Sequence, residues 1–323
     1  MTLASNLRRV RFYAKAVLRD FVPRHIYQAR LRKLFAEIEA SEGSASIRER
    51  LNYYNKINGP VRLAKAPQVG EISRDQSYYY YDLKEYTNYF DSKLQLAYRF
   101  GDVIVVPEVP SIVKSRPVSD ANANSVVMKL DKLRHFTLPT DPLSFQEKRK
   151  SAIWRGILGL NPARRVLVQK YAHHPVHDIG HTCDPMGPIA PKPYLSIQAH
   201  FQHRYILSIE GNDVATNLKW IMASRSLCVM PRPRYETWFM EGSLVPGVHF
   251  AEIRQDFADL EETIAYYDRN EDEALAIIAN ANRYVAQFLN RDTEDLLSLL
   301  VLQKYFERTG QRAPEPFSEA LFA

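Results

Sequence analysis

Cysteines, long apolar runs and repeated segments are all scarce in this chain of 323 residues. Cys183 and Cys228 are its only cysteines, and their spacing matches neither a zinc site nor a disulfide framework. This favours two reduced thiols in a cytoplasmic protein. No window approaches the roughly 18–20 uninterrupted apolar residues of a membrane-spanning helix. There is also no internal repeat and no low-complexity tract.

The composition is that of a soluble globular protein. Apolar residues make up 46% of the chain and charged residues 25%, and the length is enough for two ordinary domains. Lys and Arg number 43 against 37 Asp and Glu, a net charge of +6. This excess indicates an anionic partner, such as a nucleotide, a nucleic acid, a phosphorylated glycan or an acidic membrane.

The N-terminal segment is basic and amphipathic. It lacks the apolar core and small-residue cleavage site of a signal peptide, so we expect none. Apolar residues recur at helical steps, with basic residues between them: Val10, Tyr13, Ala14, Val17, Leu18 and Phe21 against Arg8, Arg9, Arg11, Lys15 and Arg19. Such a helix either lies on an anionic membrane surface or packs on its own domain with a basic outer face.

The pattern changes at about residue 149, which divides the chain into predicted domains 1–148 and 149–323. The first begins with helices up to the break at Gly59-Pro60, and its aromatic and β-branched segments 78–83 and 94–106 predict strands. In the second domain, strands are predicted at 152–156, 176–180, 204–210, 226–231 and 248–253. Helices are predicted at about 161–173, 214–224, 256–268 and 271–290, with another beyond Asp292.

This alternation predicts βαβ units and a parallel sheet. Ligands of such sheets bind beyond the carboxyl ends of the strands. Four loops then become candidates for a nucleotide site: those containing WRG, HDIGHTCD, EGNDVAT and PRPRYETW.

Several of these segments together resemble glycosyltransferase family 90. The resemblance is carried by AIWRG at 152–156, RYILSIEGNDVATNLKWIMASRSLCVM at 204–230 and YETWFMEGSLVPGVHFAEI at 235–253. The family includes Rumi-like protein O-glucosyltransferases, fungal capsule-associated xylosyltransferases and bacterial lipopolysaccharide core transferases. The N-terminal half is similar to the bacterial lipopolysaccharide branch, through RLNYYNKING, FGDVIVVPEVPSIVKSRPV and NSVVMKLDKLRHF.

The resemblance implies a GT-B architecture, in which two Rossmann-like domains face each other across a cleft, here with additional N- and C-terminal helices. It also implies a UDP-sugar donor held mainly by the C-terminal domain, inversion at the anomeric carbon, and no cofactor or metal.

An inverting transferase needs a carboxylate to deprotonate the acceptor hydroxyl. Asp102 follows the strand-like LQLAYRFG and matches the position where the glucosyltransferase relatives carry their catalytic aspartate. Without the resemblance, an aspartate capping a Gly-Asp turn would be the favoured explanation. Glu108 is the rival carboxylate. Next to them, Lys114, Ser115 and Arg116 are expected to contact an anionic acceptor or, alternatively, the donor diphosphate.

The donor diphosphate needs cations or N–H donors. Arg155 is the first candidate, since its guanidinium matches phosphate oxygens, although a structural ion pair is the alternative. The helix expected from Val214 would add N–H groups. Eukaryotic relatives carry an Arg in this segment where this chain has Asn217. The resemblance places Asp178 near the base and Glu236 near the ribose or sugar hydroxyls, with a plain surface carboxylate as the alternative for each. The predicted donor set also contains Gly156, Gly211, Asn212, Asp213, Ala215 and Lys219.

Histidines cluster at 173–184, where His173, His174, His177 and His181 include an i, i+4 pair. Pro175 and Gly180 interrupt any helix there and no HExxH motif occurs, so no metal site is predicted.

The sequence thus predicts transfer of a hexose, glucose or galactose, from a UDP-sugar to a lipopolysaccharide inner-core acceptor. The expected location is the cytoplasm, with the basic N-terminus on the inner membrane as a further hypothesis. Transfer of xylose or glucose to a capsule or another glycan is the enzyme alternative, and a non-catalytic nucleotide-sugar or glycan-binding protein is the alternative of another class. No RNA- or DNA-binding motif occurs, so nucleic acid is not an expected partner.

Overall fold

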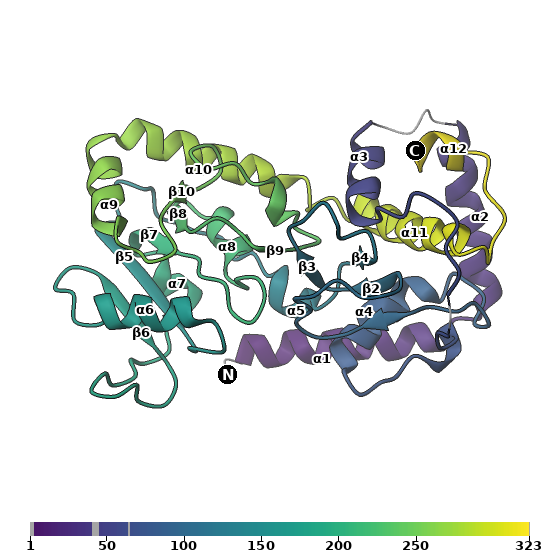
Figure 1. The fold of residues 1–323 in the computed structure, drawn as a ribbon, viewed down its shortest axis with the longest axis horizontal. Helices are drawn as coiled ribbons and strands as arrows, with labels where there is room; N and C mark the ends of the chain where they lie inside the picture. Colours follow the sequence, from purple (N-terminus) through teal and green to yellow (C-terminus); the bar gives the residue numbers. More distant parts are fainter. Residues whose placement is uncertain (1–2, 41–44, 64, 323) are drawn as a thin grey trace. The chain divides into compact units, whose positions relative to one another are not determined.

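The structure is a computed structural model that describes residues 3–40, 45–63 and 65–322 (Figure 1). Its contacts divide the chain into two compact units. The first contains Met1–Arg134, Tyr235–Met240 and Asn290–Ala323, and the second contains His135–Arg234 and Glu241–Leu289. The C-terminal helix therefore belongs to the first unit and residues 135–148 to the second. The sequence had placed the helix in the second domain and residues 135–148 in the first.

The first unit is mostly helical. Its helices are α1 (Leu3–Asp20), α2 (Arg24–Ala40), α3 (Ala45–Tyr54), η1 (Val69–Glu71), α4 (Ser77–Thr87), α5 (Lys132–His135, which ends at the boundary), α11 (Arg291–Arg308) and α12 (Ser318–Leu321). Its strands are β1 (Tyr98–Arg99), β2 (Ser111–Val113), β3 (Ser115–Pro117), β4 (Ser125–Val127) and β9 (Tyr235–Thr237). The helical N-terminus and the helix beyond Asp292 confirm two predictions.

One prediction in this unit was wrong. The tyrosine-rich segment 78–83 lies in helix α4, not in a strand. Aromatic residues favour strands on average, but tertiary packing overrides such a preference. Here Tyr79, Leu83 and Tyr86 are buried at helical spacing along one face. Within 94–106, only Tyr98–Arg99 forms a strand.

The first unit contains a parallel sheet of three short strands in the order β1-β2-β4. A separate antiparallel pair joins β3 to β9, with Arg116 opposite Glu236. Because β1, β2 and β4 run in one direction, the segments that follow them gather at a single edge of the sheet.

The second unit has the predicted alternation. Its elements are β5 (Arg149–Gly156), α6 (Pro162–Tyr171), β6 (Asp178–His181), α7 (Ile197–His200), β7 (His203–Leu207), α8 (Leu218–Met222), β8 (Leu227–Met230), η2 (Glu241–Ser243), β10 (Ala251–Glu252), α9 (Leu260–Arg269) and α10 (Glu271–Ala286). All five strands pair in parallel, in the order β10-β8-β7-β5-β6. The predicted parallel sheet is confirmed, and the unit is a Rossmann-like α/β fold.

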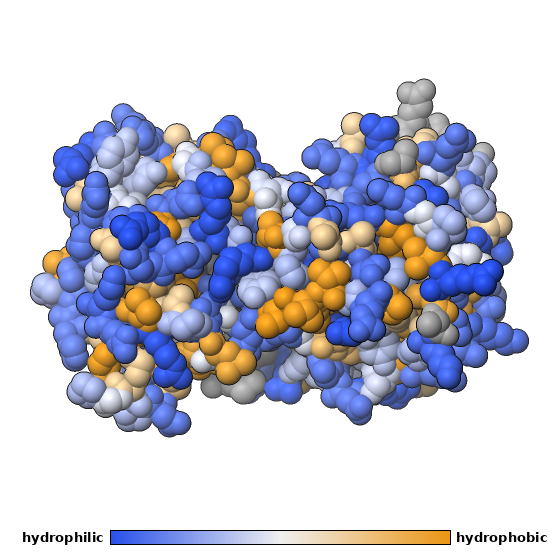
Figure 2. Space-filling view, in the orientation of Figure 1, coloured by the Kyte–Doolittle hydropathy of each residue, from blue (hydrophilic) through white to orange (hydrophobic). Residues whose placement is uncertain are grey.

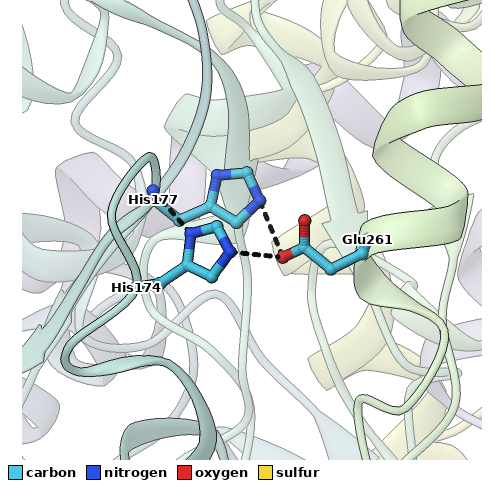
Figure 3. A group of neighbouring side chains, drawn as sticks. All are labelled: His174, His177 and Glu261. Atoms are coloured by element: carbon cyan, nitrogen blue, oxygen red, sulfur yellow. Dashed lines mark hydrogen bonds and ion pairs between the residues drawn. The ribbon is translucent and has the colours of Figure 1, made fainter.

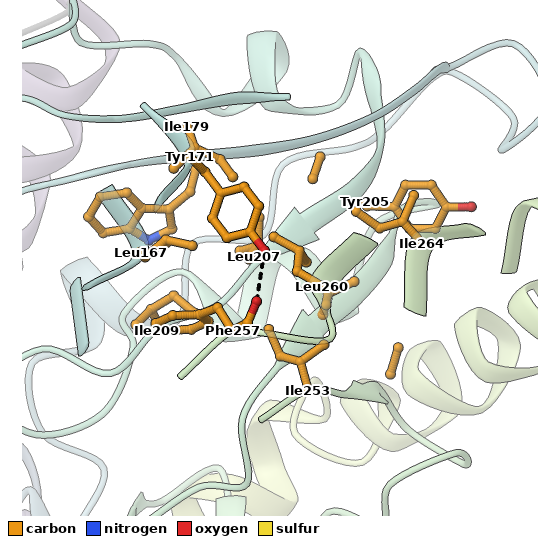
Figure 4. Close-up of a cluster of buried hydrophobic side chains, with 14 of the residues drawn as sticks. Leu167, Tyr171, Ile179, Tyr205, Leu207, Ile209, Ile253, Phe257, Leu260 and Ile264 are labelled. Carbon is orange, nitrogen blue, oxygen red and sulfur yellow. Dashed lines mark hydrogen bonds between the residues drawn. The ribbon is translucent and has the colours of Figure 1, made fainter. Parts of the chain in front are cut away.

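Both faces of the sheet in this unit are buried, since Ile153 and Ile206 are 0% exposed on one face and a large apolar cluster covers the other. Alternate strand residues such as Ala152, Tyr205 and Leu207 pack against side chains of α6 and α9 (Figure 4). Within this cluster the Tyr171 hydroxyl donates to the Phe257 carbonyl over 2.7 Å. This packing joins the strands to the helices that cover this face of the sheet.

None of the helices among the described residues is both long and apolar enough to cross a bilayer. On the face shown in Figure 2, hydrophilic side chains predominate and apolar ones form small separate groups.

Candidate functional site

Polar side chains collect at the carboxyl edge of the three-stranded sheet in the first unit. Asp102 follows β1, Lys114 follows β2 directly, and Asp131 follows β4. Lys114 is only 2% exposed, and its ammonium donates to Asp102 Oδ1 over 2.6 Å. The Asp102 side chain remains 32% exposed. The sheet thus presents a partly accessible carboxylate whose position is held by a buried cation.

A second contact holds the same segment. The Ser115 hydroxyl accepts a hydrogen bond from the Val103 amide over 3.2 Å and lies 3.3 Å from the Val103 carbonyl. The residue after Asp102 is therefore tied to the start of β3. Of the predicted residues, Asp102, Lys114 and Ser115 are brought together.

Asp131 was missed by the sequence reasoning. It is 1% exposed and adopts a positive φ of 57°, which is uncommon for a residue other than glycine. Arg134 donates to its carboxylate over 2.9 Å. Burial raises the pKa of Asp131, against the lowering effect of Arg134 and Lys114, and Asp102 raises it further. The available signal was its place after the apolar run SVVM, in the same way that Asp102 follows a strand.

Glu108 lies at the opposite edge of this sheet. Because β1 and β2 are parallel, the chain must return from Asp102 to the amino end of β2, and Glu108 precedes that end. It lines a pocket of about 430 Å³ together with Lys65, Arg99 and Ser111. Glu108, which the sequence offered as the rival of Asp102, therefore lies apart from Asp102.

Arg116 and Glu236 form a buried ion pair. They lie opposite each other in β3 and β9, 0% and 2% exposed, with Arg116 Nε 2.7 Å from Glu236 Oε1. The Tyr53 hydroxyl also donates to Glu236, and Arg116 donates to the Tyr53 carbonyl over 2.6 Å. Both charges are thus satisfied inside the first unit. The sequence had assigned one to the acceptor and the other to the donor.

The second unit has a topological switch point next to its central strand. From β5 the chain adds β6 on one side and then crosses to add β7, β8 and β10 on the other. In sheets of this order, ligands bind at the carboxyl ends of the two strands where the direction reverses. Here those strands are β5 and β7, followed by loops 157–161 and 208–217. The segment EGNDVAT lies in the second loop.

These two loops are hydrogen-bonded to each other. The backbone amide of Leu160 donates to Asn212 Oδ1 over 3.2 Å, and the side-chain amide of Asn161 donates to the Glu210 carbonyl over 2.9 Å. Arg234, which follows β8, donates from its backbone and its guanidinium to the Glu210 carboxylate. The loops after three adjacent strands therefore form one connected edge.

Arg164 organises this edge and was not predicted from sequence. Its guanidinium donates to the carbonyls of Glu210, Ile209 and Ile157 at 2.8–2.9 Å. Burial lowers its pKa to about 10, against the raising effect of Asp213 and Glu210. A side chain at Gly211 would meet this guanidinium at 3.0 Å. Gly211 thus lets the loop approach Arg164 closely.

Arg155 and Asp178, predicted at separate points of the donor site, contact each other. Their side chains form an ion pair at 2.5 Å, and Arg155 also donates to the carbonyls of Trp154, Asp178 and Pro193. Burial would raise the pKa of Asp178, but hydrogen bonds from Arg155 and Lys192 outweigh it and hold the pKa below its usual value. Asp178 opens β6 and so lies at the amino end of that strand.

Helix α8 begins at Leu218, four residues later than expected from Val214. The Asn217 side chain donates to the Leu207 carbonyl over 3.0 Å and accepts from the Ser208 hydroxyl over 3.2 Å. Lys219 is buried in an ion pair with Glu241. The Asn217 side chain therefore holds the loop after β7 against the end of that strand, whereas Lys219 is held by its counter-ion in η2. The asparagine at the position where the resemblance implies an arginine thus has structural contacts of its own.

Comparison with known proteins shows the family to which the chain belongs. Residues 124–313 match the model of glycosyl transferase family 90. O-glucosyltransferase LpsA of Dichelobacter nodosus is 46% identical over 284 residues, which cover 84% of this chain and 87% of that protein. The chain belongs to glycosyl transferase family 90. Protein O-glucosyltransferase 3 of Homo sapiens is 26% identical over 113 residues, 35% of this chain but only 22% of that protein.

As a member of family 90, the protein is a glycosyltransferase. The matched residues 124–313 include Asp131 and all loops of the switch point, whereas Asp102 and Lys114 precede them. The resemblance stated from the sequence is thus confirmed at the level of the family.

One group of side chains in this glycosyltransferase has the composition of a metal site. Among the described residues, His174, His177 and Glu261 lie close enough to share a cation (Figure 3). Glu261 Oε1 is 3.4 Å from His174 Nε2 and 3.0 Å from His177 Nε2. His173 and His181, from the same predicted cluster, are not part of this group.

The hydrogen bonds made by the His174 and His177 rings are not those expected of metal ligands. Backbone amides donate to both Nδ1 atoms, from His177 to His174 over 3.0 Å and from Ala152 to His177 over 3.2 Å. A neutral ring that accepts at Nδ1 carries its proton on Nε2, the atom that faces Glu261. A metal ligand needs a lone pair at that position. The contacts at Nδ1 therefore place a proton on each Nε2 atom, where a metal ion would need a lone pair.

Proposed function

We propose that this protein transfers glucose from UDP-glucose to a lipopolysaccharide inner-core acceptor with inversion, using two Rossmann-like units in a GT-B arrangement. The observation that carries the proposal is the 46% identity, over most of both chains, to an O-glucosyltransferase. The bacterial lipopolysaccharide branch, which the N-terminal half resembles, supports the acceptor. Galactose is the alternative sugar, since it differs in the orientation of one hydroxyl.

Asp102 is the proposed general base. As the acceptor oxygen attacks the anomeric carbon, its proton passes to the Asp102 carboxylate and the bond from the anomeric carbon to the diphosphate oxygen breaks. UDP leaves with the electron pair, and attack from the opposite face inverts the configuration. The partial exposure of Asp102 supports this role, because an acceptor hydroxyl must reach the carboxylate.

Lys114 is the proposed positioning residue for this base. A buried ammonium within 2.6 Å restricts the orientation of the Asp102 carboxylate. Asp131 lies within the electrostatic influence of both groups and of Arg134. These charges form a fixed polar environment at the sheet edge, which lowers the reorganisation needed during transfer.

We assign donor binding to the switch point of the second unit. The loops after β5 and β7 would contact the diphosphate and the sugar, with Gly156, Gly211, Asn212, Asp213, Val214 and Ala215 contributing mainly through the backbone. Arg155 donates to an aspartate and three carbonyls, so a direct phosphate contact would require it to exchange partners. We propose no metal or cofactor, because backbone N–H groups and cations can balance the departing diphosphate.

The assignment of Asp102 is tested by separating donor binding from transfer. UDP-glucose, UDP-galactose and UDP-xylose are compared for thermal stabilisation of the protein, and then for transfer to inner-core oligosaccharide. Asp102→Asn should keep the stabilisation by donor and lose transfer by at least about 100-fold. Asp75→Asn, at an exposed aspartate of the same unit, is the matched control and should retain both.

Two results would contradict the proposal. Turnover of Asp102→Asn within about tenfold of the parent would remove Asp102 as the base. Stabilisation by every UDP-sugar without release of UDP would favour the non-catalytic binding protein.

A further inference from the structure

We propose that the outer face of helix α1 is a docking surface for an anionic lipid bilayer. The inference deepens the proposed function, since a lipid-borne acceptor lies at such a surface, but the binding itself is independent of which sugar is transferred. It rests on the exposure and order of side chains on α1, on the packing of its inner face, and on the distribution of charge along the chain.

Apolar side chains form an exposed row along α1 and just beyond it. Val10, Leu18 and Phe21 are 63%, 65% and 78% exposed. Leu7, Ala14 and Val17 complete the row. Their spacing of three and four residues places them on one face of the helix. Where most of the visible surface is hydrophilic (Figure 2), a continuous apolar row of this length needs a partner.

A basic row runs beside the apolar one. Arg8, Arg11 and Lys15 each follow a member of the apolar row by one position, and all three are exposed. On a helix this places them about 100° around the axis from their apolar neighbours, along one border of the row. Cations at that level can meet lipid phosphates while the apolar side chains enter the interface.

The inner face of α1 is packed, so the helix cannot turn its apolar row inward. The Tyr13 hydroxyl is 2.7 Å from the Ser77 hydroxyl at the start of α4. The Tyr13 ring also lies 5.7 Å from that of Tyr81. Arg19 pairs with Glu85 of α4 at the other end. Figure 1 shows α1 alongside α4 within the first unit.

The charge of the N-terminal segment selects an anionic partner. Residues 1–35 contain nine Lys and Arg, and Asp20 is their only acidic residue. The net charge of the whole chain is +6, so this segment accounts for all of the excess and the remainder is slightly acidic. A second copy of the same basic helix would be repelled, whereas an anionic membrane surface is attracted.

The test is flotation of the full-length protein with vesicles of phosphatidylcholine alone or mixed with about 30% phosphatidylglycerol. The parent should float with the anionic vesicles and remain behind with the neutral ones. The double variant Leu18→Asp/Phe21→Asp should lose at least tenfold in partitioning. A matched control, Leu289→Asp/Val245→Asp, changes two other exposed apolar side chains in the second unit and should float like the parent.

A charge variant tests the basic row separately. Arg11→Gln/Lys15→Gln should weaken partitioning to anionic vesicles by about fivefold per residue and lose part of its salt dependence. All variants should keep the thermal stabilisation of the parent by UDP-glucose, which separates failure of docking from failure of the proposed function.

Three outcomes would overturn the inference. They are equal flotation of parent and Leu18→Asp/Phe21→Asp, equal partitioning of the parent to neutral and anionic vesicles, and a parent dimer in sedimentation that only the α1 variants convert to monomer. The last would identify the face as a contact between two copies.

Discussion

The buried carboxyl of Asp82 predicts a specific pH dependence of stability. Asp82 lies in α4, is 1% exposed, and accepts the backbone amide of Lys132 over 2.9 Å. Burial raises its pKa to about 7, against the lowering effect of Lys132. The same carboxyl titrates near 3.9 in an unfolded chain.

The direction of this pH dependence follows from proton binding to Asp82. Between about pH 4 and pH 7 the folded protein holds a proton on Asp82 that the unfolded chain has released. Stability from this group is therefore complete at low pH and is lost as pH rises through 7. At about 1.4 kcal/mol per pH unit, the loss between pH 5 and pH 8 is roughly 2 to 3 kcal/mol.

Asp82→Asn removes the titration and keeps an oxygen that can accept the Lys132 amide. In urea unfolding, the free energy of unfolding of the variant relative to the parent should rise by about 2 to 3 kcal/mol from pH 5 to pH 8. Asp120→Asn, at an exposed aspartate, is the control and should change by less than about 0.5 kcal/mol. An Asp82→Asn difference that is the same at both pH values would refute the reasoning, since Asp82 would then be ionised when folded.

Two further predictions concern the buried pair and the histidine group. Glu236→Gln should lower the free energy of unfolding by about 3 to 5 kcal/mol, because Arg116 is left as a buried charge without its counter-ion. The double variant Arg116→Met/Glu236→Leu should recover much of this loss, and a loss below about 1 kcal/mol for Glu236→Gln in chemical denaturation would contradict the prediction. Equimolar Zn²⁺ or EDTA should leave the melting temperature of the parent unchanged, because the Nε2 atoms of His174 and His177 carry protons. If Zn²⁺ stabilises the parent and His174→Gln abolishes that stabilisation, the group is a metal site.

The second unit was largely predictable because its signal is local. Each strand is a short apolar run and each helix follows at a regular interval, so sequence alone predicted the parallel sheet and all five of its strands. The loop with EGNDVAT could also be selected, because the carboxyl end of a strand is defined by chain direction. The loop after β5, which follows WRG, was selected in the same way, and the strand order then singled out these two of the four candidate loops.

The first unit was less predictable because its strands are very short. Strand β1 is Tyr98–Arg99 alone, too short for an alternating pattern, and α4 has the aromatic content of a strand. Asp131 was missed for a related reason. Its role depends on β4 lying beside β2, and sequence spacing carries no information on that neighbour.

The sequence by itself determined the family, the class of reaction, the alternation of strands and helices in the second unit, and the basic amphipathic character of α1, because motifs, periodicity and charge are properties of neighbouring residues. Tertiary structure decided which charges meet: Asp102 with Lys114, Arg116 with Glu236, and Arg155 with Asp178. It also placed Glu108 at the far edge of the sheet and turned Asn217 toward the end of β7. These outcomes depend on strand order and on the direction of each side chain, which only the folded chain sets.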